Sequence, residues 1–321
     1  MLKLFKSSKR IGKAILIKYL FLAYALLSLT VIYFSVASFN SYLERKELKM
    51  KAAAYEIESS FTNTLDYTES VLSHINRKIA ASGGDKAQVN KIFKSFNESH
   101  VDYASIKDLL STGKFFWIDS KGLLTASSEY GAIKVPLNVS DRDYLAKCEQ
   151  TPWKIFVGTA ITGASSGQYV VPAAVGVSDH RGHYIGTTAV GFKVYDLIEN
   201  FKKLTRDYKV DFLVLDSQNT LLMESVSGLF FEDRELARKL QHSVLEDREE
   251  TLLDFNLFSP NKNYVIERNF EKYPYKVLIS SRNSAISGGA SSEIWPHLIE
   301  LLIVTIFFST ILYFVRILVK D

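Results

Sequence analysis

Cysteine is almost absent from this chain. Cys148 is the only one among 321 residues, so an internal disulfide is excluded. We interpret this residue as a small core side chain, because a reactive thiol needs an electropositive setting. The sequence also lacks a glycine-rich phosphate-binding loop and a His-Glu-x-x-His pair, two common signs of catalysis.

Acidic residues are missing from the first thirteen positions, which hold five lysines and arginines. The whole chain has a net charge of +4, and removing those five charges leaves −1 for the rest. The basic isoelectric point therefore reflects a tail rather than a nucleic-acid-binding face, and we expect no nucleic-acid partner.

Charge is almost missing from two long apolar runs, one near each end of the chain, in which Glu300 is the one charged residue. Residues 19–37 and 298–315 are each about as long as a bilayer-spanning helix. A cleaved signal peptide is the alternative for the first run, but its apolar region would normally be shorter. We predict membrane helices over residues 14–39 and 294–318.

The outer flanks of both spans carry lysine and arginine. The positive-inside rule then places residues 1–13 and 319–321 in the cytoplasm. Everything between the spans lies outside, and we expect the inner membrane of a bacterium, with a periplasmic or extracellular region.

The stretch after the first span has a helical repeat of apolar residues. The periodicity predicts a long stalk helix over residues 40–82, ended by "SGGDK" at residues 82–86. Its apolar positions are Ile57, Phe61, Leu65, Leu72, Ile75 and Ile79.

Two similar hairpin patterns follow. "FFWIDSKGLLTASS" at residues 115–128 and "FLVLDSQNTLLMES" at residues 212–225 both place an Asp-Ser turn between apolar runs. Each precedes a helical middle, predicted at residues 234–245 in the second case, and another pair of strand-like runs. The pattern indicates an internal repeat of an α+β unit with an antiparallel sheet.

Two motifs between the hairpins suggest chemistry. "GASSG" at residues 163–167 matches a hydrolase nucleophile elbow, but a strand-like run follows it, which favours a hairpin turn. His180 and His183 lie in a predicted loop without further ligands, so we expect a solvated turn and no metal.

The stretch "VSDRDYL", residues 139–145, is the strongest candidate site. Ser140 or Asp141 can cap a short helix without any further function. Arg142 offers a planar fork for a carboxylate, and Tyr144 a hydroxyl beside an apolar ring. Together they suit recognition of a small anionic or amphoteric ligand.

These residues carry a resemblance to a known family. "SDRDYL", with the later "VGTAITGASSG" and "SDHRG", resembles the membrane-distal half of a double Cache domain, although Leu145 replaces the usual Phe. Such PAS-like extracellular domains occur in bacterial sensor histidine kinases, diguanylate cyclases and chemoreceptors. The resemblance implies a membrane-distal module over residues 83–204 and a membrane-proximal one over residues 205–290, both on the long N-terminal helix.

Residue types and the resemblance together predict a ligand site in the membrane-distal module. The expected ligand-binding residues are Arg142, Tyr144, Asp143, Trp117, Ser127, Ser166 and Tyr169. In the alternative reading, Arg142 is structural and pairs with a neighbouring aspartate or a backbone carbonyl. We expect no catalytic residue and no cofactor.

The resemblance implies a sensor, and the chain ends soon after the second span. We therefore expect a sensor without its own output domain that binds an amino acid, a carboxylate or an amine. It would signal through a kinase or cyclase partner and form a homodimer through the stalk helix. The alternatives are a remnant or split half of a kinase or cyclase receptor, a non-sensing structural membrane protein and, least favoured, an extracytoplasmic hydrolase.

Overall fold

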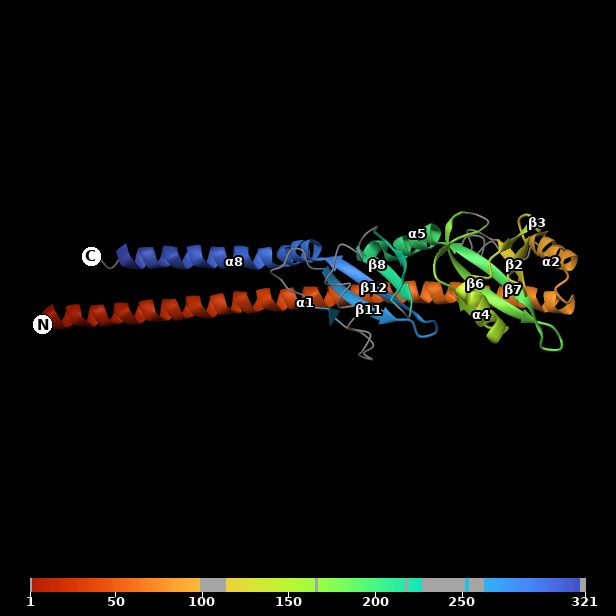
Figure 1. The fold of residues 1–321 in the computed structure, drawn as a ribbon. Coiled ribbons are helices and arrows are strands. Elements are labelled where there is room, and N and C mark those ends of the chain that lie inside the picture. The colour runs from red at the N-terminus through yellow and green to blue at the C-terminus, as the bar shows by residue number, and fades with distance from the viewer. Residues whose placement is uncertain are drawn as a thin grey trace. The chain divides into compact units, whose positions relative to one another are not determined.

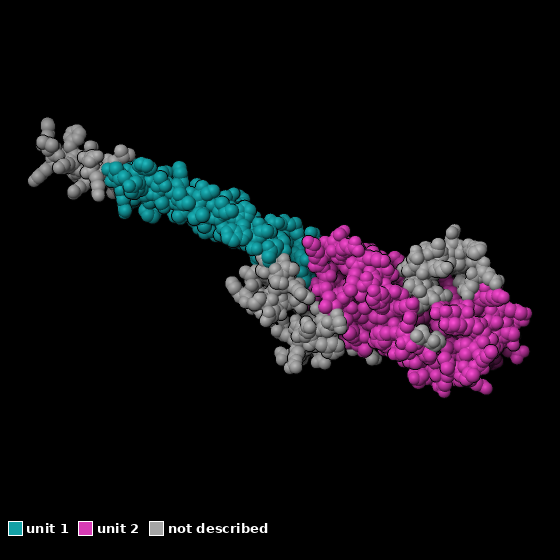
Figure 2. Space-filling view, turned by 90° about the horizontal axis from the view of Figure 1, so that it is seen from above, with its two compact units in different colours: residues 1–50, 254–264, 281–321 teal, residues 51–253, 265–280 magenta. Residues whose placement is uncertain are grey.

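The computed structural model describes residues 2–98, 114–164, 167–216, 219–226, 252–253 and 263–317. The chain divides into two compact units (Figure 2). One unit comprises residues 1–50, 254–264 and 281–321, and the other comprises residues 51–253 and 265–280. The second unit holds the first sheet and most of the second.

Helix α1, Leu2–Ala81, is the longest element (Figure 1). All six predicted apolar positions of its outer half are buried. It ends where predicted, because Gly83 and Gly84 adopt positive φ angles of 65° and 75° that favour glycine. The shorter helix α2, Lys86–Glu98, follows at once.

The first sheet has seven antiparallel strands in the order β3-β2-β1-β7-β6-β4, with β5 pairing to β6. Helix α4, Asp143–Gln150, lies between β3 and β4 in sequence, and α5, Val194–Thr205, follows β7. The strands are β1 Phe115–Asp119, β2 Leu123–Ser127, β3 Gly131–Asn138, β4 Ile155–Val157, β5 Ile161–Thr162, β6 Tyr169–Ser178 and β7 Tyr184–Lys193.

The second sheet has five strands in the order β10-β11-β12-β8-β9. This repeats the order β4-β6-β7-β1-β2 of the first sheet, so the predicted fold of two PAS-like modules on a long helix is confirmed. The predicted helix at residues 234–245 lies outside the described residues. The strands are β8 Asp211–Asp216, β9 Leu221–Glu224, β10 Leu252–Leu253, β11 Asn263–Asn269 and β12 Tyr275–Arg282.

The two Asp-Ser hairpins match in their hydrogen bonds. In β1–β2 the Ser128 hydroxyl accepts from the Phe115 N–H, and in β8–β9 the Ser225 hydroxyl accepts from the Phe212 N–H, both at 2.9 Å. A turn aspartate oxygen accepts from backbone N–H groups in each hairpin. Both strand pairs also contain a register shift. The repeat seen in the sequence is therefore also present in the structure.

The two faces of the first sheet have different coverings. On one face, Asn76 of α1 donates to the Val175 carbonyl and accepts from the Thr188 hydroxyl. On the other face, α4 buries Tyr144, Leu145 and Cys148 against the strands. The sheet therefore separates α1 from α4.

An aromatic cluster forms the core between α1 and the second sheet. The Phe61 ring of α1 lies 5.4 Å from Tyr275, 6.0 Å from Phe270 and 6.1 Å from Phe201, between ring centroids. Phe201 in turn contacts Phe212 at 5.8 Å. Edge-on packing of large rings adds to the area that they bury.

In the described part of the chain, two helices are long and apolar enough to span a membrane, α1 and α8, Asn283–Ile317. They pair through Tyr24 with Thr305 at 3.1 Å and through Ser38 with His297 at 3.1 Å. The partners on α8 occur in reverse order along the chain, so the two spans are antiparallel. Their outer ends therefore lie on the same side, as a two-pass topology requires.

Candidate ligand-binding site

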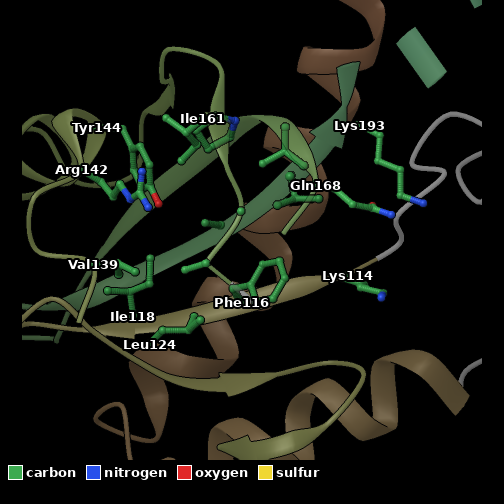
Figure 3. Close-up of a pocket in the computed structure, with 17 residues that line it drawn as sticks. Lys114, Phe116, Ile118, Leu124, Val139, Arg142, Tyr144, Ile161, Gln168 and Lys193 are labelled. Atoms are coloured by element: carbon green, nitrogen blue, oxygen red, sulfur yellow. The ribbon is translucent and has the colours of Figure 1, made fainter. Parts of the chain in front are cut away.

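A pocket opens on the face of the first sheet that α4 covers (Figure 3). The space inside it and at its open mouth together amounts to about 720 Å³. Most of its wall is apolar. The larger apolar side chains are Phe116, Ile118, Leu124, Val139, Ile161 and Val170.

Arg142 occupies the N-cap position of α4, with extended φ and ψ angles of −77° and 128°. The expectation that Ser140 or Asp141 caps this helix is wrong, because the helix begins two residues after Asp141 and makes no side-chain cap bond. Asp143 lies in the first turn, as predicted. The extended N-cap backbone places the Arg142 and Tyr144 side chains at the same end of the pocket (Figure 3).

The Arg142 guanidinium is largely buried but poorly paired. Its side chain is 23% exposed, and its one ion pair is a 3.7 Å contact with Asp141, whose side chain is 76% exposed. Among the residues that the structure describes, the guanidinium donates no hydrogen bond. A partly exposed guanidinium that lines a pocket and has a weak ion pair can bind an anion there.

Tyr144 is 5% exposed and lines the same end of the pocket. Burial raises the pKa of Tyr144 well above its ordinary value, although the charge of Arg142 acts in the opposite direction. The phenol therefore stays protonated at neutral pH and can donate a hydrogen bond. In the described part of the chain its hydroxyl has no hydrogen-bond partner.

No family model matches the sequence, and no curated protein does. Solved structures do match. The extracellular domain of the putative histidine kinase rpHK1S-Z16 has a TM-score of 0.51 at 16% identity, with 77% of this chain and 98% of that one covered. The sensory domain of the Campylobacter jejuni chemoreceptor Tlp3, with isoleucine bound, has a TM-score of 0.52 at 15% identity, with 79% and 98% covered.

A third match is the ligand-binding domain of Mlp24 with asparagine. Its TM-score is 0.53 at 9% identity, with 78% of this chain and 99% of that one covered. The chain has the double Cache fold. This is the fold that the "SDRDYL" resemblance implied, and it is shared with extracellular sensory domains.

Within this double Cache fold, three further predicted residues stand apart from the pocket. Asp143 is exposed, and its carboxylate accepts from the N–H of Tyr144 at 2.9 Å. Trp117 is buried on the opposite face of β1, where its ring lies close to Gly186. Tyr169 is 53% exposed and alternates with the pocket residues on either side of it.

Two predicted serines remain. Ser127 pairs with Phe116 across the ladder and therefore shares the pocket face, but it does not line the pocket. Its hydroxyl accepts from the Glu129 N–H at 3.2 Å. Ser166 lies outside the described residues.

Three polar wall residues were not predicted from the sequence. Lys114, Gln168 and Lys193 line the end of the pocket away from Arg142 (Figure 3). They come from the starts of β1 and β6 and the end of β7, which only the sheet order brings together. Alternation along β6 could have indicated Gln168, because it places residues 168 and 170 on one face.

The other sequence motifs have structural roles in this region. Gly163 and Gly167 belong to the turn between β5 and β6, as expected, where the Gly163 N–H donates to the Gln168 carbonyl at 2.8 Å. His183 pairs with Asp179 at 3.4 Å in the β6–β7 turn. Burial raises the pKa of Cys148 to about 12, which keeps the thiol protonated and unreactive.

Proposed function

We propose that this protein is a membrane-anchored extracytoplasmic sensor that binds a small anionic ligand in the pocket beside α4. The observation that carries the proposal is the pair of donors at one end of the pocket. A partly buried guanidinium and a buried phenol line the same apolar pocket and donate no hydrogen bond to another described residue. A carboxylate would accept from both.

The comparisons support the same conclusion at the level of fold. The related structures include sensory domains of a histidine kinase and of chemoreceptors, and several of the latter contain an amino acid such as isoleucine, valine or asparagine. Small polar molecules therefore fit this architecture. A partner with histidine kinase or cyclase activity is the expected recipient of the signal.

The proposed topology has both termini in the cytoplasm. It rests on the antiparallel spans and on the basic residues at their outer flanks. Reporter fusions after Lys13, at Gly83 and after Lys320 test it. A cytoplasmic signal from the Gly83 fusion would contradict the proposal.

Ligand binding is tested with the purified full chain in nanodiscs. A thermal-shift screen against carboxylates, amino acids and amines identifies a stabilising compound, and titration calorimetry then measures its affinity. Arg142→Ala removes the proposed hydrogen bond from the guanidinium to the ligand, and a charged hydrogen bond is worth about 1.5–3 kcal/mol. We expect the Kd of the compound to rise about ten- to a hundredfold.

Arg181→Ala is the matched control, because Arg181 is exposed in the β6–β7 turn. It should leave the affinity unchanged. If Arg142 is only structural, Arg142→Ala lowers the melting temperature and leaves the affinity as in the wild type. That outcome would overturn the proposed role of Arg142, and a screen without any binder would overturn the sensor proposal.

The signalling partner is tested in membranes. The stabilising compound should change histidine phosphorylation or cyclic-dinucleotide synthesis when the wild-type chain is present. Membranes with the Arg142→Ala chain should respond only at higher concentration, by the same factor as the change in Kd. An equal response in membranes without the chain would exclude it from the signalling route.

A further inference from the structure

The pocket has a second polar end. Figure 3 shows Arg142 and Tyr144 at one end and Lys114, Gln168 and Lys193 at the other. Between these ends lie apolar side chains. A ligand that fills this pocket therefore contacts hydrogen-bond donors at both ends and apolar side chains between them.

The two lysines of the second end differ in their pairing. The Lys114 ammonium lies 2.6 Å from the Glu129 carboxylate, so its charge is largely balanced. Lys193 is half-buried at the last position of β7 and has no ion pair with any described residue. Among the described residues, the positive charge at this end that has no ion pair is therefore that of Lys193.

The described wall also contains no carboxylate side chain. A zwitterionic amino acid would bring an ammonium group into a cavity lined by Arg142, Lys114 and Lys193. Like charges repel, and the neighbouring carboxylates of Asp141 and Glu129 are already paired with Arg142 and Lys114. The wall therefore favours a ligand that carries negative charge only.

We propose that the ligand is a linear α,ω-dicarboxylate. One carboxylate accepts from Arg142 and Tyr144, the methylene chain lies along Phe116 and Ile118, and the other carboxylate lies near Lys193. This inference rests on the proposed function and specifies the ligand class of the same site.

The test compares three ligand series on the full chain in nanodiscs by titration calorimetry. The first series contains the dicarboxylates from succinate to suberate, the second the monocarboxylates of equal length, and the third the matching α-amino acids. We expect one dicarboxylate to bind at least about tenfold more tightly than its monocarboxylate and amino acid counterparts.

Lys193→Gln then separates the two ends. It should weaken the best dicarboxylate about three- to tenfold and leave the monocarboxylate unchanged, because only the former reaches Lys193. Lys203→Gln removes the same charge from an exposed position on α5 and should change neither affinity.

Two results would overturn the dicarboxylate proposal while leaving the sensor proposal intact. One is tighter binding of a monocarboxylate or an amino acid that depends on Arg142. The other is a dicarboxylate affinity that Lys193→Gln does not change. If no dicarboxylate binds, the dicarboxylate proposal is also wrong. The sensor proposal then depends on whether the thermal-shift screen finds any other ligand.

Discussion

The two sheets pack against the same helix, α1, through different polar chemistry. The first sheet meets the neutral amide of Asn76, which bonds to Thr188 and to the Val175 carbonyl. The second sheet and the segment after β11 meet carboxylates of α1, with Glu58 paired to Arg268 and Asp66 paired to Lys272.

This difference separates two kinds of attachment. Glu69 of α1 also contacts the first module, where its carboxylate accepts from the N–H of Ile155. Hydrogen bonds between neutral groups depend little on salt and pH, whereas ion pairs depend on both. Because the second sheet and the segment after β11 form ion pairs with α1, their attachment should respond more strongly to salt.

The largest expected effect comes from Glu58→Ala. Glu58 is 6% exposed and accepts from both Arg268 and the Glu271 N–H, so Glu58→Ala removes the carboxylate that joins α1 to β11 and to the segment after it. Breaking a buried pair costs about 3–5 kcal/mol. Hydrogen exchange should rise in β11 and β12 and stay low in β6 and β7. Equal loss of protection in both sheets would contradict the comparison.

The next effect is confined to the first sheet. A Cβ at Gly176 would lie 2.2 Å from the Cys148 carbonyl oxygen, so Gly176→Ala should force α4 away from β6. Overpacking of this kind costs about 1–3 kcal/mol. Thermal unfolding measures the loss. Gly191→Ala is the control, because its nearest neighbour would be an ordinary contact of 3.4 Å; an equal loss there would refute the steric argument.

Asn76→Leu tests the neutral attachment. It leaves the Thr188 hydroxyl and the Val175 carbonyl without their partner in a fully buried place, at a cost of about 1–3 kcal/mol. The loss, measured by chemical denaturation, should be the same at low and high salt. The exposed Asn63→Leu on the same helix should have little effect. If the stability lost in Asn76→Leu depended strongly on salt, the distinction between neutral and ionic attachment to α1 would be wrong.

The smallest effect is a pH dependence at Asp66. Burial raises the pKa of Asp66, but hydrogen bonds from Lys272 and Tyr273 outweigh it, so the pKa lies below its ordinary value of 3.8. A depressed carboxyl pKa stabilises the fold above the unfolded value and loses that contribution as pH falls through the folded value. Exchange of residues 270–274 should therefore increase below pH of about 4. Asp66→Asn should remove this pH dependence of exchange. If the pH dependence persists in the variant, another titrating group causes it.

The repeated architecture could be predicted because its signals are local. Each Asp-Ser hairpin encodes its turn and its flanking strands within fourteen residues, from Phe115 to Ser128 and from Phe212 to Ser225. The end of α1 likewise follows from two adjacent glycines. Arg142 and Tyr144, which both line the pocket, could be singled out because their residue types and motif are distinctive.

The other pocket residues depend on which alternate residues of each strand face the pocket, and the sequence does not specify this. Trp117 is the most conspicuous side chain of β1, yet its neighbours Phe116 and Ile118 face the pocket. The register shift between β1 and β2 changes which residue of β2 lies on which face. Lys193 joins the wall only because β7 pairs with β1.

The placement of Trp117 has an optical consequence. Its indole lies behind the pocket wall, 1% exposed, between strand residues and the turn that follows α1. A ligand against Phe116 would shift the strand that carries this fluorophore without touching it. The emission wavelength of Trp117 would therefore report the occupancy of the pocket from the far side of the sheet, once Trp153 and Trp295 are replaced by phenylalanine.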